Sequence, residues 1–241
     1  MKSIRSLMFF VLLALFITPS TYAQALLPDT QVYSKNATGV IDYYNENIKG
    51  QTELYNGPKY EIMPPANKGT YYFGDNVYCT PATVYFNGTW YKNLPVLYDV
   101  YHDQMISYTG DNFFVLDKTK NTDIKLLDHH FKYLDQPGLN PGYFDVLYNG
   151  KSQALAKRTK VVNEDIISQR EVQTTVVDKT QLYLKKGNTF FPVTGKNSVL
   201  SIFSDRKKEI KQFLHDQKID FNLDKEAAFI VIARYYDQLN K

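Results

Sequence analysis

The sequence predicts a mainly β protein of the α+β class, in which antiparallel β-meanders and hairpins form a sandwich or a partial barrel that ends in a C-terminal helical hairpin. Aromatic residues are abundant, with 20 Tyr and 15 Phe, and such side chains suit a pleated, half-buried surface. Asn-Gly pairs follow short apolar segments, as they do in tight hairpin turns. Near the C-terminus the spacing of apolar residues changes to that of a helix.

The first 23 residues have the pattern of a cleavable signal peptide. Lys2 and Arg5 precede an apolar run over residues 7–17, and small residues occupy the two positions of Thr21-Tyr22-Ala23 that a signal peptidase reads. This run is shorter than the roughly 20 residues that cross a bilayer. We therefore expect a signal peptide at 1–23 and a mature chain without a membrane span, located in the periplasm, on the outer surface or outside the cell.

The composition predicts one main domain without nucleic-acid binding. Removing Lys2 and Arg5 from the 28 Lys and Arg leaves 26 against 25 Asp and Glu, whereas nucleic-acid binding proteins carry a clear basic excess. The single cysteine, Cys79, cannot form an internal disulfide, so the core alone must hold the fold. We divide the chain into the signal peptide, an antiparallel β domain at 24–200 and a helical hairpin at 201–241 packed on the sheet.

Four hairpins are predicted from turn residues. Asn56-Gly57, Asn87-Gly88 and Asn149-Gly150 each follow a strand-like segment, and both residues of such a pair tolerate the positive φ of a type I′ turn. A fourth hairpin is predicted over residues 181–193. The pairs are separated by 31 and 62 residues, which leaves open a structural repeat or a coincidence among common turn residues.

The C-terminal segment is predicted to contain two helices. Ser204 is placed to cap a helix whose apolar residues lie at 210–214, and Asn222 to cap a second with apolar residues at 227–235. The apolar residues beside these helices would attach them to the sheet.

Several aromatic and turn motifs are similar to those of a known group of proteins. They are Leu54-Tyr55-Asn56-Gly57, Gly69-x-Tyr71-x-Phe73, Leu97-Tyr98-Asp99, Pro137-Gly138 and Gly142-Tyr143-Phe144. In these motifs the chain resembles uncharacterised exported β-rich proteins of diderm bacteria, over most of its length after the signal peptide. The resemblance implies export and a β-rich fold, and it implies no catalytic residue or ligand.

Histidines and acids cluster at Asp128-His129-His130 and His102-Asp103. On a strand, His129 and His130 would point to opposite faces, so they could not hold one ion without a bulge. We therefore expect no metal site, and since motifs for binding nucleotides are also absent from the sequence, we expect no cofactor.

No catalytic motif stands out from the sequence. Cys79 has no basic neighbour to activate it and is expected to be a buried small hydrophobe. Two carboxylates could hydrolyse a glycoside, but the sequence does not distinguish Asp99, Asp103, Asp128 and Asp145 as candidates.

The preferred hypothesis is therefore a non-enzymatic envelope or secreted protein that binds an envelope protein or a glycan. Its candidate ligand-binding residues are Trp90, Tyr85 and Tyr91, although Trp90 could instead anchor the core. Trp90 and Tyr91 would face opposite sides of a regular strand. The alternatives are a polysaccharide-directed hydrolase and an assembly subunit of an envelope complex that pairs through its sheet edge.

Overall fold

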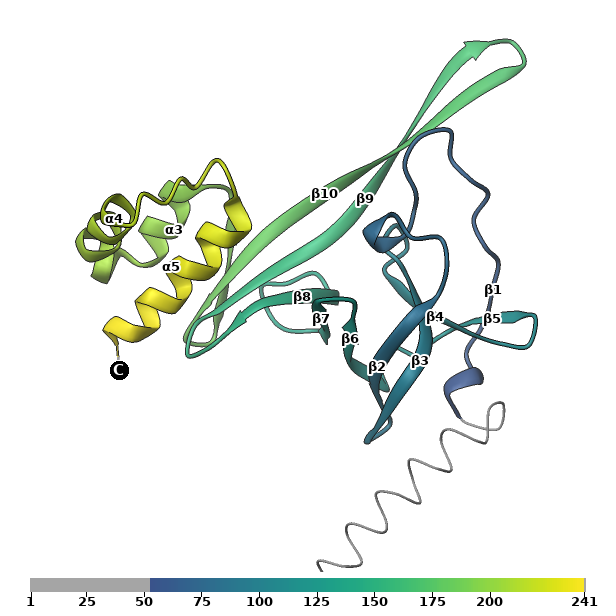
Figure 1. Ribbon diagram of the computed structural model, residues 1–241, viewed down its shortest axis with the longest axis horizontal. Helices are drawn as coiled ribbons and strands as arrows, with labels where there is room; N and C mark the ends of the chain where they lie inside the picture. The colour runs from purple at the N-terminus through teal and green to yellow at the C-terminus, as the bar shows by residue number, and fades with distance from the viewer. Residues whose placement is uncertain (1–52, 241) are drawn as a thin grey trace, which may run out of the picture. The chain divides into compact units, whose positions relative to one another are not determined.

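The computed structural model describes residues 53–240. The predicted signal peptide at 1–23 and the start of the predicted β domain lie outside these residues. The described residues form one antiparallel sheet followed by helices (Figure 1). This confirms the predicted mainly β, antiparallel architecture with C-terminal helices. No helix within residues 53–240 combines the length and apolar character needed to cross a bilayer.

The sheet contains eleven strands within the described residues. They are β1 (Lys59–Tyr60), β2 (Thr80–Phe86), β3 (Thr89–Asp99), β4 (Gln104–Thr109), β5 (Asn112–Val115), β6 (Asn121–Leu126), β7 (His129–Leu134), β8 (Gly142–Asn149), β9 (Gln153–Ser168), β10 (Glu171–Lys186) and β11 (Thr189–Val193). The helices are α3 (Lys196–Ile202), α4 (Lys207–Asp216) and α5 (Lys225–Leu239), with short 3-10 turns η2 (Glu53–Tyr55), η3 (Phe73–Asp75) and η4 (Ser204–Arg206).

The strand order is β1-β5-β4-β3-β2-β6-β7-β8-β9-β10-β11. Strands that follow one another in the chain are therefore neighbours nearly everywhere, as in a meander. There are two exceptions: β2 pairs with β6 as well as with β3, and β1 pairs with β5. Strands β3, β4 and β5 extend the sheet on one side of β2, and the chain then returns to the other side of β2 as β6. Strand β1 pairs with β5 at the edge of the sheet.

Two main hydrophobic cores lie on one face of the sheet. The strand core is formed mainly by β2, β3, β6, β7 and β8, and its largest buried side chains include Phe86, Tyr98, Phe131 and Tyr143. The helix core forms where the helices pack on β8 to β11, with Phe203 and Phe229 fully buried. Burial of these aromatic rings supplies the apolar area that the fold needs without a disulfide.

The helical segment differs in detail from the predicted hairpin. A third helix, α3, begins at Lys196, before the predicted boundary, and Ser204 begins η4 instead of capping a helix. The cap of α5 is Asp224, whose Oδ1 accepts a hydrogen bond from the Ala227 amide at 2.9 Å. Asn222 is not the cap, because α5 begins at Lys225; its amide instead donates to Asp220 in the preceding turn.

The predicted turns gave mixed results. Asn87-Gly88 joins β2 to β3 with φ values of 46° and 85°, as a type I′ turn requires. The predicted hairpin over 181–193 is also present, between β10 and β11. Asn149-Gly150 begins a longer connection between β8 and β9. The prediction was wrong for Asn56-Gly57, which lies between η2 and β1 and joins no hairpin. The spacing of 31 and 62 residues therefore does not mark a repeated hairpin.

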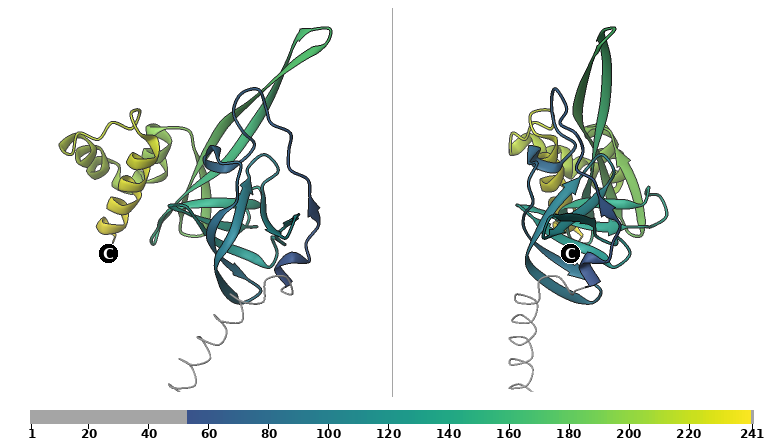
Figure 2. Two further views of the ribbon diagram at one scale, coloured as in Figure 1. Left: turned by 45° about the vertical axis from the view of Figure 1, so that its right-hand side comes forward. Right: turned by 90° about the vertical axis from the view of Figure 1, so that its right-hand side faces the viewer.

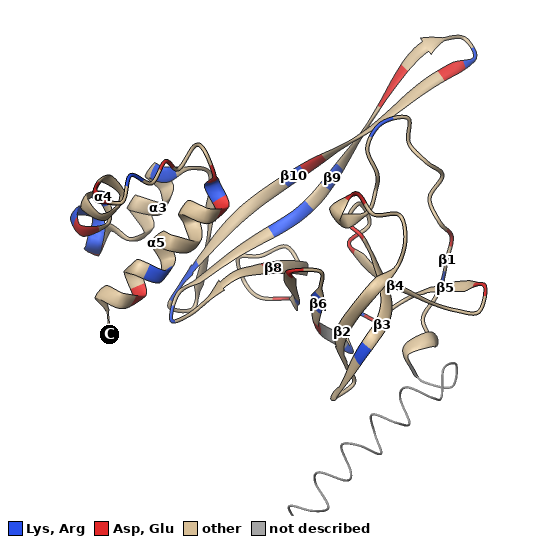
Figure 3. Cartoon of the chain, viewed as in Figure 1, with Lys and Arg blue, Asp and Glu red and all other residues tan. Residues whose placement is uncertain are grey.

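Strands β9 and β10 form a long arm that the sequence reading did not anticipate. Each has 16 residues, but β8 pairs with β9 only as far as Ala156 and β11 pairs with β10 only from Leu182 onward. The rest of this hairpin, residues 157–181, extends away from the sheet and is called the arm here (Figures 1 and 2). Charged residues lie on both of its strands (Figure 3).

A loop from the N-terminal side of the sheet braces the arm. The Val176 amide donates to the Lys68 carbonyl at 2.8 Å, and the Lys68 amide donates to the Thr174 carbonyl at 3.2 Å. Gly69 has φ +78°, and a Cβ on it would lie 2.2 Å from the Val176 carbonyl oxygen. A side chain at this position would therefore push the loop off the arm.

Candidate functional site

The exposed Trp90 and the half-buried Tyr85 form an aromatic pair on the sheet. The two residues are cross-strand partners on β3 and β2, and their ring centroids are 5.1 Å apart. Trp90 is 42% exposed, so it is not the core anchor that was the alternative reading. The Nζ of Lys125 lies 5.6 Å from the centre of the Trp90 ring, which adds a cation–π contact to the pair.

Tyr91 does not join this pair. It is opposite Val84 in the β2–β3 register and packs beside the strand core. The strand alternation therefore separates Tyr91 from Trp90, as expected for neighbouring residues. Two of the three candidate residues lie together, and the third lies on the other face.

The aromatic pair continues across the sheet into charged residues. The register places Trp90 opposite Tyr85, Tyr85 opposite Asp123, and Asp123 opposite Lys132. We call these four residues, on β3, β2, β6 and β7, the aromatic row. With strands ~4.8 Å apart, the row spans roughly 14 Å.

Asp123 is fixed at the centre of this surface. Its Oδ1 lies 2.5 Å from His130 Nε2, and its Oδ2 lies 3.1 Å from Lys132 Nζ. His130 is in turn opposite Lys125, the residue that lies beside the Trp90 ring. The surface thus combines an apolar end with oriented hydrogen-bonding groups.

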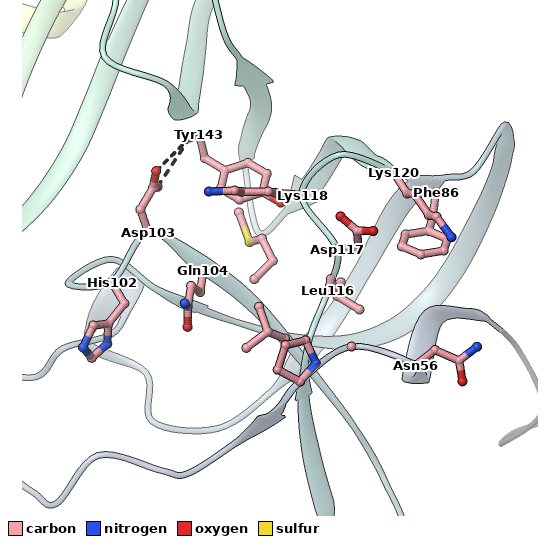
Figure 4. A pocket seen from close by; sticks show the side chains of 14 residues that line it. Asn56, Phe86, His102, Asp103, Gln104, Leu116, Asp117, Lys118, Lys120 and Tyr143 are labelled. Atoms are coloured by element: carbon pink, nitrogen blue, oxygen red, sulfur yellow. Dashed lines mark hydrogen bonds between the residues drawn. The ribbon is translucent and has the colours of Figure 1, made fainter.

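A cavity of about 330 Å³ lies on the other face, beside the strand core. Four buried residues, Phe86, Met105, Leu116 and Tyr143, line it. Its polar lining comes from three separate parts of the chain and consists of Asn56, His102, Asp103, Gln104, Asp117, Lys118 and Lys120 (Figure 4). We call it the rim cavity.

Asp103 is held firmly at the wall of the rim cavity. It accepts hydrogen bonds from the Tyr98 hydroxyl at 2.6 Å and from the Tyr143 amide at 3.2 Å, and its Oδ2 is 2.6 Å from Lys157 Nζ. Burial, together with the charge of Asp103, raises the pKa of Tyr98 well above its usual range. Burial lowers the pKa of Lys157, although Asp103 opposes this effect. The charge of Lys157 therefore offsets that of the Asp103 carboxylate within the protein.

A second cleft, of about 370 Å³, lies between η3, β9, β10 and the start of α5. His129 and Arg158 line it, and both contact the buried Asp145 at 2.7 Å and 2.6 Å. Arg158 also pairs with Glu226 in the first turn of α5. We call these four residues the buried charge cluster, and it connects the strand core to the helices.

The electrostatics of this cluster favour the charged form of Asp145. Burial would raise the pKa of Asp145, but hydrogen bonds from His129 and Arg158 outweigh burial and hold its pKa below the usual range. A carboxyl group with a lowered pKa is a poor proton donor at neutral pH. The cluster is therefore better suited to joining elements of the fold than to acid catalysis.

The candidate acids are thus distinguished by their partners. Asp99 is fully buried and bonds to Tyr60 and His102, whereas Asp128 is exposed at the β6–β7 turn. Asp103 pairs with Lys157, and Asp145 pairs with Arg158. Among residues 53–240, these four acids provide no pair of free carboxylates facing one cavity, so the geometry does not favour the hydrolase alternative.

The histidine cluster also separates as the strand pattern predicts. His129 contacts Asp145 on the core face, and His130 contacts Asp123 on the aromatic-row face. No group of three or more His, Cys, Asp or Glu side chains in the described part of the chain is arranged to hold a metal ion.

The sequence analysis missed the buried Asp–His pairs. Asp99 ends β3 directly after an apolar stretch, and Asp145 lies within the apolar part of β8, next to Phe144. A carboxylate in such a strand is expected to have a buried partner, because an unpaired buried charge is costly. This signal was available, although it could not identify the partner.

Comparison with known proteins gives no relative. No family model, curated protein or solved structure matches this chain. The function must therefore be inferred from the geometry of the chain itself.

Cys79 yields a prediction on reactivity. Burial raises the pKa of its thiol to about 11, whereas an unfolded cysteine titrates near 8.5. Since the thiolate is the reactive form, alkylation by iodoacetamide at pH 8 should be roughly 100-fold slower in the folded protein than in urea. Equal rates in the two states, followed by mass spectrometry, would contradict this assignment.

Proposed function

We propose that the protein is an exported binding protein of the cell envelope that recognises a glycan on the aromatic row. The observation that carries this proposal is the register itself, which aligns Trp90, Tyr85, Asp123 and Lys132 on four adjacent strands. The exposed Trp90 ring beside Tyr85 offers a large apolar surface, which gains free energy when a ligand covers it.

The chemistry of the aromatic row matches that of a sugar. A pyranose ring has an apolar face of C–H groups, which can stack on Trp90, and hydroxyl groups that both donate and accept hydrogen bonds. Asp123 supplies acceptors, and Lys132 and His130 supply nitrogen atoms for hydrogen bonding. A few oriented polar groups beside an apolar surface are the usual basis of ligand specificity.

The length of the aromatic row fits an oligosaccharide. The row of roughly 14 Å, from three strand spacings, would contact two to three linked sugars of about 5 Å each. Export is supported by the signal-peptide pattern at 1–23, and an exported protein meets glycans of the cell wall, the outer surface and the medium.

Trp90 provides a direct test because it is the single tryptophan of the chain. Its fluorescence should change when residues 24–241 are titrated with a panel of peptidoglycan fragments, lipopolysaccharide core oligosaccharides and plant β-glucans. The Trp90→Ala variant should bind at least tenfold more weakly by calorimetry, which corresponds to a stacking contribution of about 1.5 kcal/mol.

The matched control is Tyr78→Ala. Tyr78 is 76% exposed and lies before β2, outside the aromatic row, so its loss should leave the affinity unchanged. Equal affinity of the wild type and Trp90→Ala for a bound glycan would overturn the proposal. Binding of a protein partner but of no glycan would also overturn it.

A further inference from the structure

The rim cavity has the composition of a small-molecule site. Its apolar lining residues are almost completely buried, with Phe86 at 1%, Met105 at 0% and Leu116 at 1% exposure, and its polar residues surround them (Figure 4). Its volume of about 330 Å³ falls in the range of ligand pockets, which typically combine an apolar lining with a few polar groups.

The carboxylates around this cavity are already satisfied. Asp103 is paired with Lys157, and Asp117 Oδ1 accepts hydrogen bonds from both the amide and the hydroxyl of Thr119, at 3.0 Å and 2.7 Å. These bonds hold the pKa of Asp117 below its usual range. Both carboxylates are therefore already bonded within the protein.

Lys118 also lines the cavity, and neither of these two carboxylates is its ion-pair partner. It extends toward Tyr143 and Asp103 (Figure 4), and its Nζ lies 5.8 Å from the centre of the Tyr133 ring. It forms no ion pair within the described residues, and its charge contributes to lowering the pKa of Lys157. The charges of the lining balance, with Lys118 and Lys120 against Asp103 and Asp117. Lys157, which pairs with Asp103 from outside the lining, adds one positive charge.

We propose that the rim cavity binds a small amphipathic anion, with a carboxylate or sulfonate beside Lys118 and an apolar group on Phe86, Met105 and Leu116. An anion there relieves the repulsion between Lys118 and Lys157, and its apolar part leaves water for the buried lining. This site is separate from the aromatic row, since it lies on the opposite face of the sheet.

The experiment uses residues 24–241 and 8-anilinonaphthalene-1-sulfonate, an apolar anion that fluoresces in apolar surroundings. We expect saturable binding that 4-phenylbutyrate displaces about tenfold more effectively than its neutral isostere, 4-phenylbutanamide. Lys118→Gln, which keeps most of the side-chain stem, should weaken the binding of the two anions about threefold to fivefold and leave the binding of the amide unchanged, because one exposed ion pair is removed.

Two variants serve as controls. Lys211→Gln removes an exposed lysine of α4 and should leave all affinities unchanged, and so should Trp90→Ala, which alters only the aromatic row. Equal displacement by the acid and the amide would overturn the proposal. The proposal would also be overturned if Lys118→Gln bound the two anions as tightly as the wild type does. Loss of anion binding in Trp90→Ala would overturn it as well.

Discussion

Replacing Asp145 by alanine is expected to destabilise the protein by about 3–5 kcal/mol. The carboxylate is only 2% exposed and contacts His129 and Arg158 within 2.7 Å. Its removal leaves Arg158, which is only 14% exposed, with one carboxylate partner instead of two. Truncating one member of a buried ion pair is costly because the charge that remains is poorly solvated.

Glu226→Gln is the matched comparison at the other end of the buried charge cluster. Glu226 is 35% exposed, so water can replace much of its role, and we expect a loss of at most about 1 kcal/mol. Urea unfolding followed by circular dichroism measures both variants. Losses of similar size for Asp145→Ala and Glu226→Gln would show that burial does not set the strength of these contacts.

Asp145 also leads to a prediction for the stability of the protein at low pH. Because the folded pKa of Asp145 is below the ordinary value of 3.8, its contribution to stability is fully present above pH ~4 and is lost as the pH falls through the lowered folded pKa. The free energy of unfolding should therefore fall more steeply below pH 4 in the wild type than in Asp145→Asn.

Phe131→Ala should have a comparable effect, about 3–5 kcal/mol. Phe131 is completely buried in the strand core, with the rings of Phe73 and Tyr98 each 5.0 Å from its own. Removal of the ring leaves a cavity that these rigid neighbours cannot close. Phe131→Leu keeps most of the volume and should cost less than about 2 kcal/mol.

Urea unfolding of the Phe131 variants can be followed by two separate signals, Trp90 fluorescence and the helical circular dichroism signal. Trp90 lies on β3, whereas the helices pack on β8 to β11. Since β8 contributes to both cores, we expect both signals to shift to the same lower urea midpoint. A shift of only the fluorescence signal would mean that the two cores unfold independently, and an alanine variant as stable as Phe131→Leu would refute the cavity argument.

The sequence predicted the parts of the fold that local chemistry controls. Asn87-Gly88 forms its turn because both residues tolerate positive φ and both flanking segments are strands. Asn56-Gly57 has the same residues, but its glycine serves another purpose. A Cβ on Gly57 would lie 1.8 Å from the Val115 carbonyl oxygen, and sequence alone does not show this close approach of two distant segments.

The arm and the candidate sites depend on contacts that sequence spacing hides. Residues 157–181 mix charged and β-branched residues without marking where neighbouring strands stop. Trp90 and Tyr85 could be proposed together because one hairpin turn pairs them, but Asp123 joins them only through the non-sequential pairing of β2 with β6. Lys118 and the rim cavity require three distant segments to meet.

The strand order also has a consequence for how the chain folds. Strands β6 to β11 pair with their neighbours along the chain, so each pairing closes only a short loop, whereas Lys59 of β1 must find Phe114 of β5. Closing long loops costs more entropy and slows the search for partners. We expect the C-terminal hairpins to assemble early and the two-residue β1 to dock last. Amide protons of β5 that face β1 would then exchange with solvent sooner than those at the centre of the sheet.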